Sequence, residues 1–230
     1  MRMRPPATEE RRARLSDTSR VEAFSDGVFA IVITLLVLDV RVPDAEAGHL
    51  ADGLVDQWPT YVAYATSFLY VGIVWLNHHA AFDRIRRTDR GLHWANLGVL
   101  ATVALLPFPT AVLSYAVESD NATDARAAAV LYAIIAMLMC ASWLGFFHYL
   151  DRHPELLEED LEEGFFARER MRAIAGIAAY AVAGIVGFLN APLAAMVIFF
   201  AVPAFFGATS QGLSELHAVM RVPGRPGRRR

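Results

Sequence analysis

Long apolar runs alternate with short charged segments along the chain, and there are six such runs. A helix needs about 20 mostly apolar residues to cross the hydrocarbon core of a bilayer. None of the runs shows the polar–apolar alternation of a barrel strand, so we expect helices, which satisfy their backbone hydrogen bonds internally. The expected spans cover approximately residues 24–42, 59–82, 92–117, 125–150, 173–189 and 192–209.

The composition agrees with an all-α membrane protein. Hydrophobic residues make up 55% and charged residues 20% of the 230 positions, whereas a soluble domain carries more charge. The single cysteine, Cys140, lies in an apolar run and cannot form an intrachain disulfide. We therefore expect Cys140 to be a small packing residue.

The positions of the arginines predict the orientation of the spans. The chain has no lysine, and its arginines gather before the first span, after the second, after the fourth and after the sixth. Only Arg41 and Arg126 fall on the other side. Because cytoplasmic loops carry the excess of basic residues, we expect a multi-pass protein of the inner membrane with both termini in the cytoplasm.

One transmembrane domain, residues 20–210, is expected between a basic cytoplasmic arm, 1–19, and a basic tail, 211–230. Prolines and glycines predict disorder in the tail, and its arginines favour anionic lipid headgroups as the partner, since no nucleic-acid-binding motif is recognisable. In the acidic loop at 151–172, Leu156, Leu157 and Leu161 share a face at helical spacing. This loop is either a short surface helix or a solvated acidic segment.

Prolines are expected to interrupt two of the spans. The sequence Pro107-Phe108-Pro109 breaks the hydrogen-bond ladder of the third span, and Pro203 lies in the sixth. A tight turn is predicted at Asn190-Ala191-Pro192, between the fifth and sixth spans.

The first span carries an apolar stripe at helical spacing. It consists of Gly27, Ile31, Leu35 and Leu38, with one hydroxyl at Thr34. Such a stripe is common in ordinary helix packing. If first spans from several subunits met around an axis, the same stripe would form apolar rings that gate by dewetting, and Thr34 could coordinate a partly dehydrated cation.

Polar residues lie at the start of this span, where a charge costs roughly 2.5–3.5 kcal/mol unless it is paired or faces protein or water. Arg20 and Asp26 are six residues apart, so they do not share a helix face. Ser25 and Asp26 suit the free N–H groups and positive dipole of a helix start. Arg20 either joins a network with other spans or extends to lipid phosphate.

The adjacent histidines His78 and His79 raise the question of a metal site. Neighbouring helix residues point about 100° apart, whereas chelating pairs stand at i and i+4, so we expect no metal at this pair. Hydrogen bonds between helices are the expected role, and Asn96 in the third span suits the same role.

These elements together resemble a known family. Arg20-x-x-x-Phe24-Ser25-Asp26, followed by an apolar span, and Trp75-Leu76-Asn77-His78-His79 are similar to the signature of the endosomal and lysosomal potassium channels, in their bacterial branch with one motif copy. The resemblance covers most of residues 20–210.

This resemblance implies a homotetramer of six-span subunits in which the first helix lines a central pore. It assigns the apolar constriction to Ile31, Leu35 and Leu38, and a selectivity layer to Thr34. The family passes potassium without a Thr-Val-Gly-Tyr-Gly filter, and this sequence contains no such run. The resemblance also implies a structural network that uses Arg20, Phe24, Ser25, Asp26, Trp75, Asn77, His78 and His79, and we add Asn96.

We therefore expect a potassium-permeable channel whose partners are further copies of itself, the lipid bilayer and potassium ions, with no cofactor. The alternative is a proton-coupled secondary transporter that uses Asp26 and His78. An enzyme is not expected, because the chain has neither Gly-x-Ser-x-Gly nor His-Glu-x-x-His.

Overall fold

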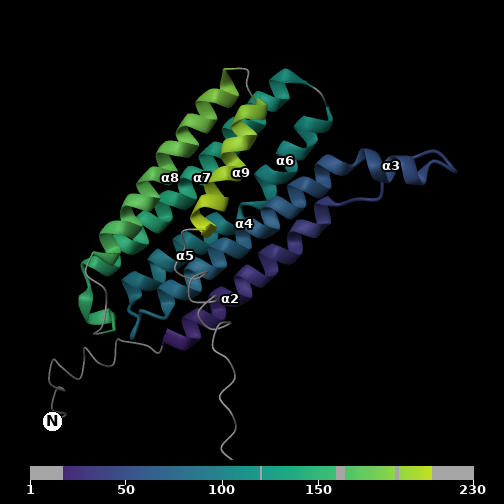
Figure 1. Ribbon diagram of the computed structural model, residues 1–230. Helices are drawn as coiled ribbons and strands as arrows, with labels where there is room; N and C mark the ends of the chain where they lie inside the picture. The colour runs from purple at the N-terminus through teal and green to yellow at the C-terminus, as the bar shows by residue number, and fades with distance from the viewer. Residues whose placement is uncertain (1–17, 120, 159–163, 190–191, 209–230) are drawn as a thin grey trace, which may run out of the picture.

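The computed structural model of the chain is a bundle of helices (Figure 1). It describes residues 18–119, 121–158, 164–189 and 192–208. The expected all-α class is confirmed, since every named element in these ranges is a helix, and an isolated bridge joins Ile85 to Leu157. The elements are α2 (Thr18–Leu35), η1 (Leu36–Asp39), α3 (Leu50–Asp56), α4 (Trp58–Phe82), α5 (Arg90–Ala104), α6 (Pro107–Glu118), α7 (Ala122–Asp151), η2 (Pro154–Leu156), α8 (Phe165–Phe188) and α9 (Pro192–Ala208).

Five helical stretches in the described residues are long and apolar enough to cross a membrane. They are α2 with η1, α4, α5 with α6, α7 and α8. The expected sixth span corresponds to α9, which has 17 residues in the structure, and its crossing of the membrane stays a prediction. The turn expected at residues 190–192 falls largely outside the described residues.

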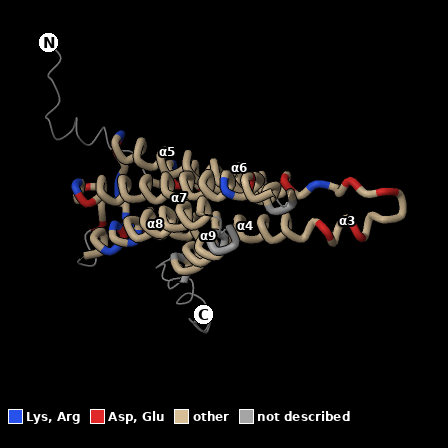
Figure 2. The backbone as a smooth tube through the Cα atoms, turned by 90° about the horizontal axis from the view of Figure 1, so that it is seen from above, with Lys and Arg blue, Asp and Glu red and all other residues tan. Residues whose placement is uncertain are grey.

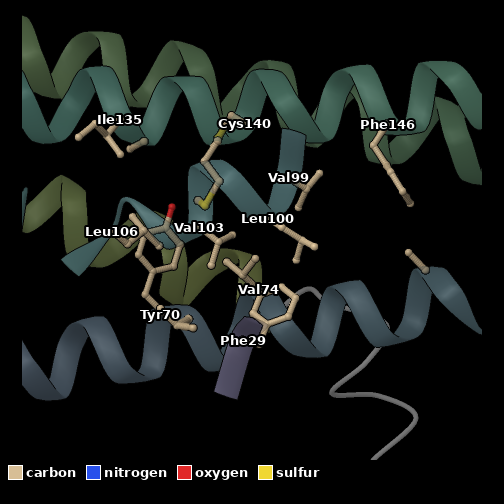
Figure 3. Packing of buried hydrophobic residues seen from close by; sticks show 14 of the residues in the cluster. Phe29, Tyr70, Val74, Val99, Leu100, Val103, Leu106, Ile135, Cys140 and Phe146 are labelled. Carbon is tan, nitrogen blue, oxygen red and sulfur yellow. The ribbon is translucent and has the colours of Figure 1, made fainter. Parts of the chain in front are cut away.

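Helix α7 lies at the centre of the bundle and packs against α5, α6, α8 and α9. Helix α2 lies at one edge, where it contacts α4 and α5 (Figure 1). Most of the buried side chains between these helices are apolar, and Figure 3 shows part of the cluster that they form. One exception joins α4 to α8, where the hydroxyls of Tyr70 and Tyr180 lie 2.8 Å apart.

Charged residues lie mainly toward the two ends of the bundle (Figure 2). The arginines that follow α4 and those that begin α8 lie at the same end as the start of α2, because consecutive spans run antiparallel. Almost all of the N-terminal arm and the whole of the tail from 211 lie outside the described residues.

The spans differ from the expected boundaries where polar residues continue a helix beyond its apolar core. Helix α2 begins by Thr18 instead of Phe24, and α8 begins at Phe165 instead of Ala173. The first span also ends at Asp39, before Val42. Ser25 and Asp26 therefore lie inside the helix, so the expectation that they serve its N-terminal N–H groups was wrong. The short helix α3, which projects beyond the bundle, was not expected (Figure 1).

The predicted interruption of the third span is confirmed. Helix α5 ends at Ala104 and α6 begins at Pro107, a position where a missing N–H costs nothing. Thr110 stabilises the break, since its hydroxyl donates to the Leu106 carbonyl and lies 2.8 Å from Ser67 Oγ of α4. Pro203 lies inside α9.

In its described part before α8 begins at Phe165, the acidic loop forms the three-residue 3-10 helix η2 and no longer surface helix. Leu156 and Leu157 are buried under the loop that joins α4 to α5. The Arg86 amide donates to the Leu156 carbonyl at 2.9 Å, and the Glu158 amide donates to the Arg84 carbonyl at 3.1 Å. This pairing of two distant loops overrides the local helical spacing, and Leu161 lies outside the described residues.

Candidate functional site

Helix α2 presents two different faces. Ser25, Phe29 and Val32 are buried against α4 and α5. The opposite face is open, and the exposed fractions of its apolar side chains are 57% for Phe24, 59% for Ile31, 45% for Leu35 and 66% for Leu38. One chain therefore leaves an apolar stripe along the length of its first span uncovered.

Thr34 lies on the exposed side of α2, next to this stripe. Its hydroxyl donates to the Ile31 carbonyl at 2.8 Å, as a threonine inside a helix commonly does. Because the hydroxyl proton is used within the helix, the oxygen presents its acceptor side outward. An oxygen in that orientation can coordinate a cation.

A chain of hydrogen bonds runs behind the stripe and joins three helices. His78 Nε2 of α4 lies 2.8 Å from Asn96 Oδ1 of α5, and Asn96 Nδ2 donates to Ser25 Oγ of α2 at 2.9 Å. Ser25 Oγ in turn donates to the Val21 carbonyl at 2.9 Å. Because the amide oxygen of Asn96 can only accept, His78 must carry a proton on Nε2 and donate it to Asn96.

The same chain is closed off from water. Ser25, His78 and Asn96 are all buried. The His78 ring stacks on Phe82 at 4.4 Å between ring centroids, and Phe29 of α2 meets it edge-on at 5.2 Å. Hydrogen bonds in such a dry environment fix geometry strongly, because neither partner can exchange it for water.

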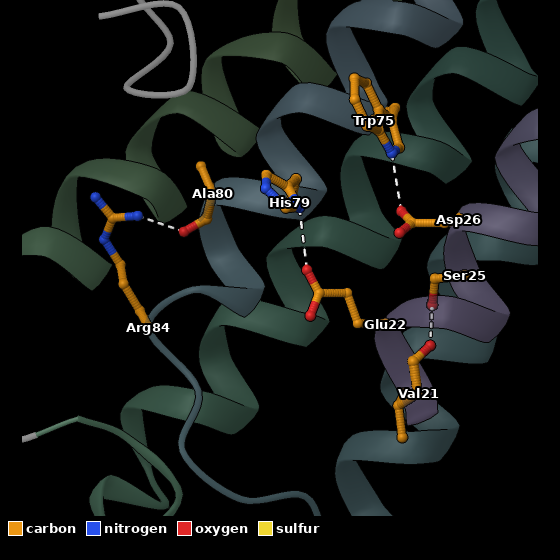
Figure 4. A network of polar contacts seen from close by, with 8 residues as sticks. All are labelled: Val21, Glu22, Ser25, Asp26, Trp75, His79, Ala80 and Arg84. Atoms are coloured by element: carbon orange, nitrogen blue, oxygen red, sulfur yellow. Dashed lines mark hydrogen bonds and ion pairs between the residues drawn. The ribbon is translucent and has the colours of Figure 1, made fainter. Parts of the chain in front are cut away.

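A second, half-buried pair of contacts links α2 to α4 (Figure 4). Trp75 Nε1 donates to Asp26 Oδ1 at 2.9 Å. One turn later in α4 and one turn earlier in α2, His79 Nδ1 lies 3.0 Å from Glu22 Oε1. The rings of Trp75 and His79 stack at 5.9 Å between centroids, so the two contacts support each other.

Three of the expected network residues lie elsewhere. Phe24 is on the exposed stripe, and Arg20 is exposed and makes no contact with Ser25 or Asp26 in the described part of the chain. Asn77 lines a cavity of about 80 Å³ between α4, α7 and α8, on the side away from α2. Glu22 was not predicted as a member of the network, although it precedes Asp26 by one helical turn and therefore lies on the same face of α2.

Residues 20–107 match the family described as endosomal/lysosomal potassium channel TMEM175. A protein of Streptomyces collinus named potassium channel is 40% identical over 180 residues, which cover 78% of this chain and 86% of that relative. The chain belongs to the TMEM175 channel family.

The TMEM175 fold is also recognised in three dimensions. A crystal structure titled lysosomal potassium-selective channel TMEM175 homolog, from Chamaesiphon minutus, matches with a TM-score of 0.71 at 33% identity. The match covers 84% of this chain and 98% of that one. The family resemblance read from the two sequence motifs is therefore confirmed.

A longer TMEM175 relative is found in Homo sapiens and is named endosomal/lysosomal proton channel. It is 32% identical over 182 residues, which cover 74% of this chain and 35% of the human protein. The present chain thus spans about a third of that protein's length.

Proposed function

We propose that this chain is the subunit of a potassium-permeable channel in which α2 lines the path of the ion. The observation that supports this most directly is the uncovered apolar stripe of α2, which stands opposite a face held by buried hydrogen bonds. The bacterial relatives that match this chain are named potassium channels, and one of them covers most of both chains. Potassium is therefore the ion we assign.

Four copies around an axis would bury the stripe. Ile31, Leu35 and Leu38 then form successive apolar rings, and Thr34 supplies a layer of hydroxyl oxygens. Apolar rings of this kind hold a path closed by dewetting and open it with a small increase in radius. The tetramer is part of this proposal, and the family resemblance supports it.

The buried contacts hold α2 in register with the bundle. Ser25, Asp26, Trp75, His78, His79 and Asn96 take this role through the bonds described above. The roles expected for Arg20, Phe24 and Asn77 remain predictions, and the exposed positions of Arg20 and Phe24 suit contacts with another copy or with lipid.

The arginine-rich end of the bundle is assigned to the cytoplasm of the inner membrane, in agreement with the positive-inside rule. The start of α2 lies at this end. The termini at 1–17 and 209–230 are assigned to the same side from their arginine content alone.

The alternative function, a proton-coupled secondary transporter, gains no support from the arrangement of Asp26 and His78. Asp26 accepts from Trp75, whereas His78 bonds Asn96 in a separate, buried chain. A proton relay requires its members to contact each other or a common water path. Passive conduction therefore remains the function we propose.

The test is ion flux from liposomes that contain purified protein and a potassium gradient. A pH-sensitive dye reports the flux, a proton ionophore supplies counter-charge, and valinomycin gives the total releasable signal. The proposal predicts potassium flux that follows voltage, does not saturate with potassium and requires the ionophore. Proton movement without the ionophore would assign the path to protons, and saturable flux driven by a pH gradient would replace the channel with a transporter.

A further inference from the structure

Three side chains able to bind a metal meet where α2 lies beside the end of α4. Glu22 comes from α2, His79 from the last turn of α4, and Asp83 follows α4 directly. One ligand atom from each lies within 4.8 Å of the other two. His79 and Asp83 stand at i and i+4, the spacing that the adjacent histidines lacked, and Figure 4 shows Glu22 and His79 pointing toward each other.

We propose that Glu22, His79 and Asp83 bind a divalent transition metal of the zinc class. One imidazole nitrogen and two carboxylate oxygens suit Zn²⁺, which commonly takes three protein ligands and a water. Magnesium and calcium prefer oxygen ligands alone, so the imidazole favours the softer ion. The other histidine of the pair, His78, is committed to Asn96 and takes no part.

The spacing of the ligand atoms is close to that of an occupied site. Ligands about 2.0–2.2 Å from a tetrahedral zinc lie roughly 3.3–3.6 Å from each other. Glu22 Oε1 and His79 Nδ1 are already 3.0 Å apart. Asp83 is exposed and, within the described residues, its carboxylate has no hydrogen bond or ion pair, so it can turn toward the other two.

The histidine of the site is oriented before any metal binds. Trp75 stacks on the His79 ring with 23° between the planes, and Trp75 is itself held by its bond to Asp26. Supporting contacts of this kind set the direction of a ligand and raise the affinity of a metal site. In their absence a surface histidine would lose side-chain entropy on binding.

The cluster has one competing explanation. A protonated His79 between the two carboxylates would account for the short contact with Glu22 without any metal. The two explanations differ in what Asp83 does. A metal site needs it as a ligand, whereas the ion pair between His79 and Glu22 is complete without it.

A metal here would tie α2 to α4 at one end of the bundle. If α2 lines the ion path, bound metal restrains that helix and changes the flux. This consequence rests on the proposed function, whereas the binding of the metal does not. The two are therefore measured separately.

The first experiment titrates the full-length purified protein in detergent with Zn²⁺ by calorimetry, and with Co²⁺ by visible absorption. We expect one ion per chain, and a Co²⁺ spectrum typical of low coordination number. Asp83→Asn should weaken binding by about tenfold or more, since even outer partners of a metal site are worth that much. Glu22→Gln should do the same.

The matched control is Asp52→Asn in α3. Asp52 lies 3.2 Å from His49 in an exposed pair that has no third ligand in the described residues, so Zn²⁺ affinity should not change. Asp83→Asn should leave flux without metal at the wild-type level, because Asp83 is exposed and lies outside the contacts that hold α2.

Equal Zn²⁺ binding by wild type and Asp83→Asn, or no binding by the wild type, overturns the site. If zinc binding depends on Asp83 but the protein passes no potassium, the metal site is supported and the channel proposal is contradicted. If the protein passes potassium but binds no zinc, the channel proposal is supported and the metal site is contradicted.

Discussion

Asn96 of α5 donates a hydrogen bond to Ser25 of α2 at 2.9 Å, and it does so from inside the packed core. The same amide accepts from His78 of α4 at 2.8 Å. One side chain therefore fixes the positions of two other helices. The face of α2 that meets Asn96 is set, and as a consequence the opposite face must point out of the subunit.

Asn96→Ala should lower the stability of the protein. The change leaves the His78 Nε2–H group in the core without its partner, at a cost of about 1–3 kcal/mol. Thermal unfolding in detergent, followed by circular dichroism, measures the loss. Asn77→Ala is the matched control on the neighbouring helix, because Asn77 faces a cavity and not α2. An equally large loss of stability in Asn77→Ala would show that the hydrogen bonds of Asn96 contribute no more to stability than an ordinary buried side chain.

Tyr70 and Tyr180 should be energetically coupled. Their hydroxyls bond each other at 2.8 Å in the core, so either single change to phenylalanine leaves the other hydroxyl unpaired. The double change to phenylalanine removes the bond and leaves neither hydroxyl unpaired. A double-mutant cycle of unfolding in detergent should give a coupling of about 0.5–1.5 kcal/mol. Strictly additive effects would mean that the bond contributes nothing.

Gly91→Ala should destabilise the start of α5. An added methyl group at residue 91 would meet the phenol ring of Tyr149, whose hydroxyl donates to Asp89 at 2.7 Å. Asp89 also caps α5 by accepting from the Leu92 amide at 2.8 Å. Loss of such a cap costs about 1 kcal/mol. Gly98→Ala, where an added methyl group meets open space, is the control, and equal melting temperatures for the two variants would contradict this account.

Thr34→Val should reduce the preference of the channel for potassium over sodium and leave the fold intact. Valine keeps the shape of threonine but removes the oxygen that faces outward from α2. Reversal potentials in mixed potassium and sodium solutions measure the preference. Thr66→Val, on a groove between α4, α6 and α9, should leave the reversal potential unchanged. An unchanged ratio in Thr34→Val would remove the selectivity layer from the account.

The long helices of this protein could be predicted from its apolar runs, because a membrane span needs about 20 mostly apolar residues in succession. The second span was expected at 59–82 and is found at Trp58–Phe82. The starts of α2 and α8 were missed because charged residues, such as Arg20 in α2 and Arg168 in α8, precede their apolar cores. Such charges do not distinguish a helix outside the bilayer from a loop. The burial of Leu156 and Leu157 depends on a loop more than 60 residues away.

The candidate site was partly readable from the sequence. Ser25, Asp26, Trp75, His78, His79 and Asn96 do meet, but which residue bonds which could not be deduced from spacing within one helix. Trp75 pairs with Asp26, and Asn96 stands between His78 and Ser25. Predicting the third contact, between Glu22 and His79, requires the offset of α2 relative to α4 along their axes, and only the packed bundle shows this offset.

The central claim is that the exposed stripe of α2 lines the ion path, and thiol modification of Leu35→Cys tests it most directly. The wild type provides its own control, since its single cysteine, Cys140, is buried. Ile185→Cys on α8 is the matched variant, because Ile185 is 59% exposed and lies away from α2. A charged thiol reagent should abolish potassium flux through Leu35→Cys and spare both controls. Flux that survives complete modification of Leu35→Cys would contradict the claim.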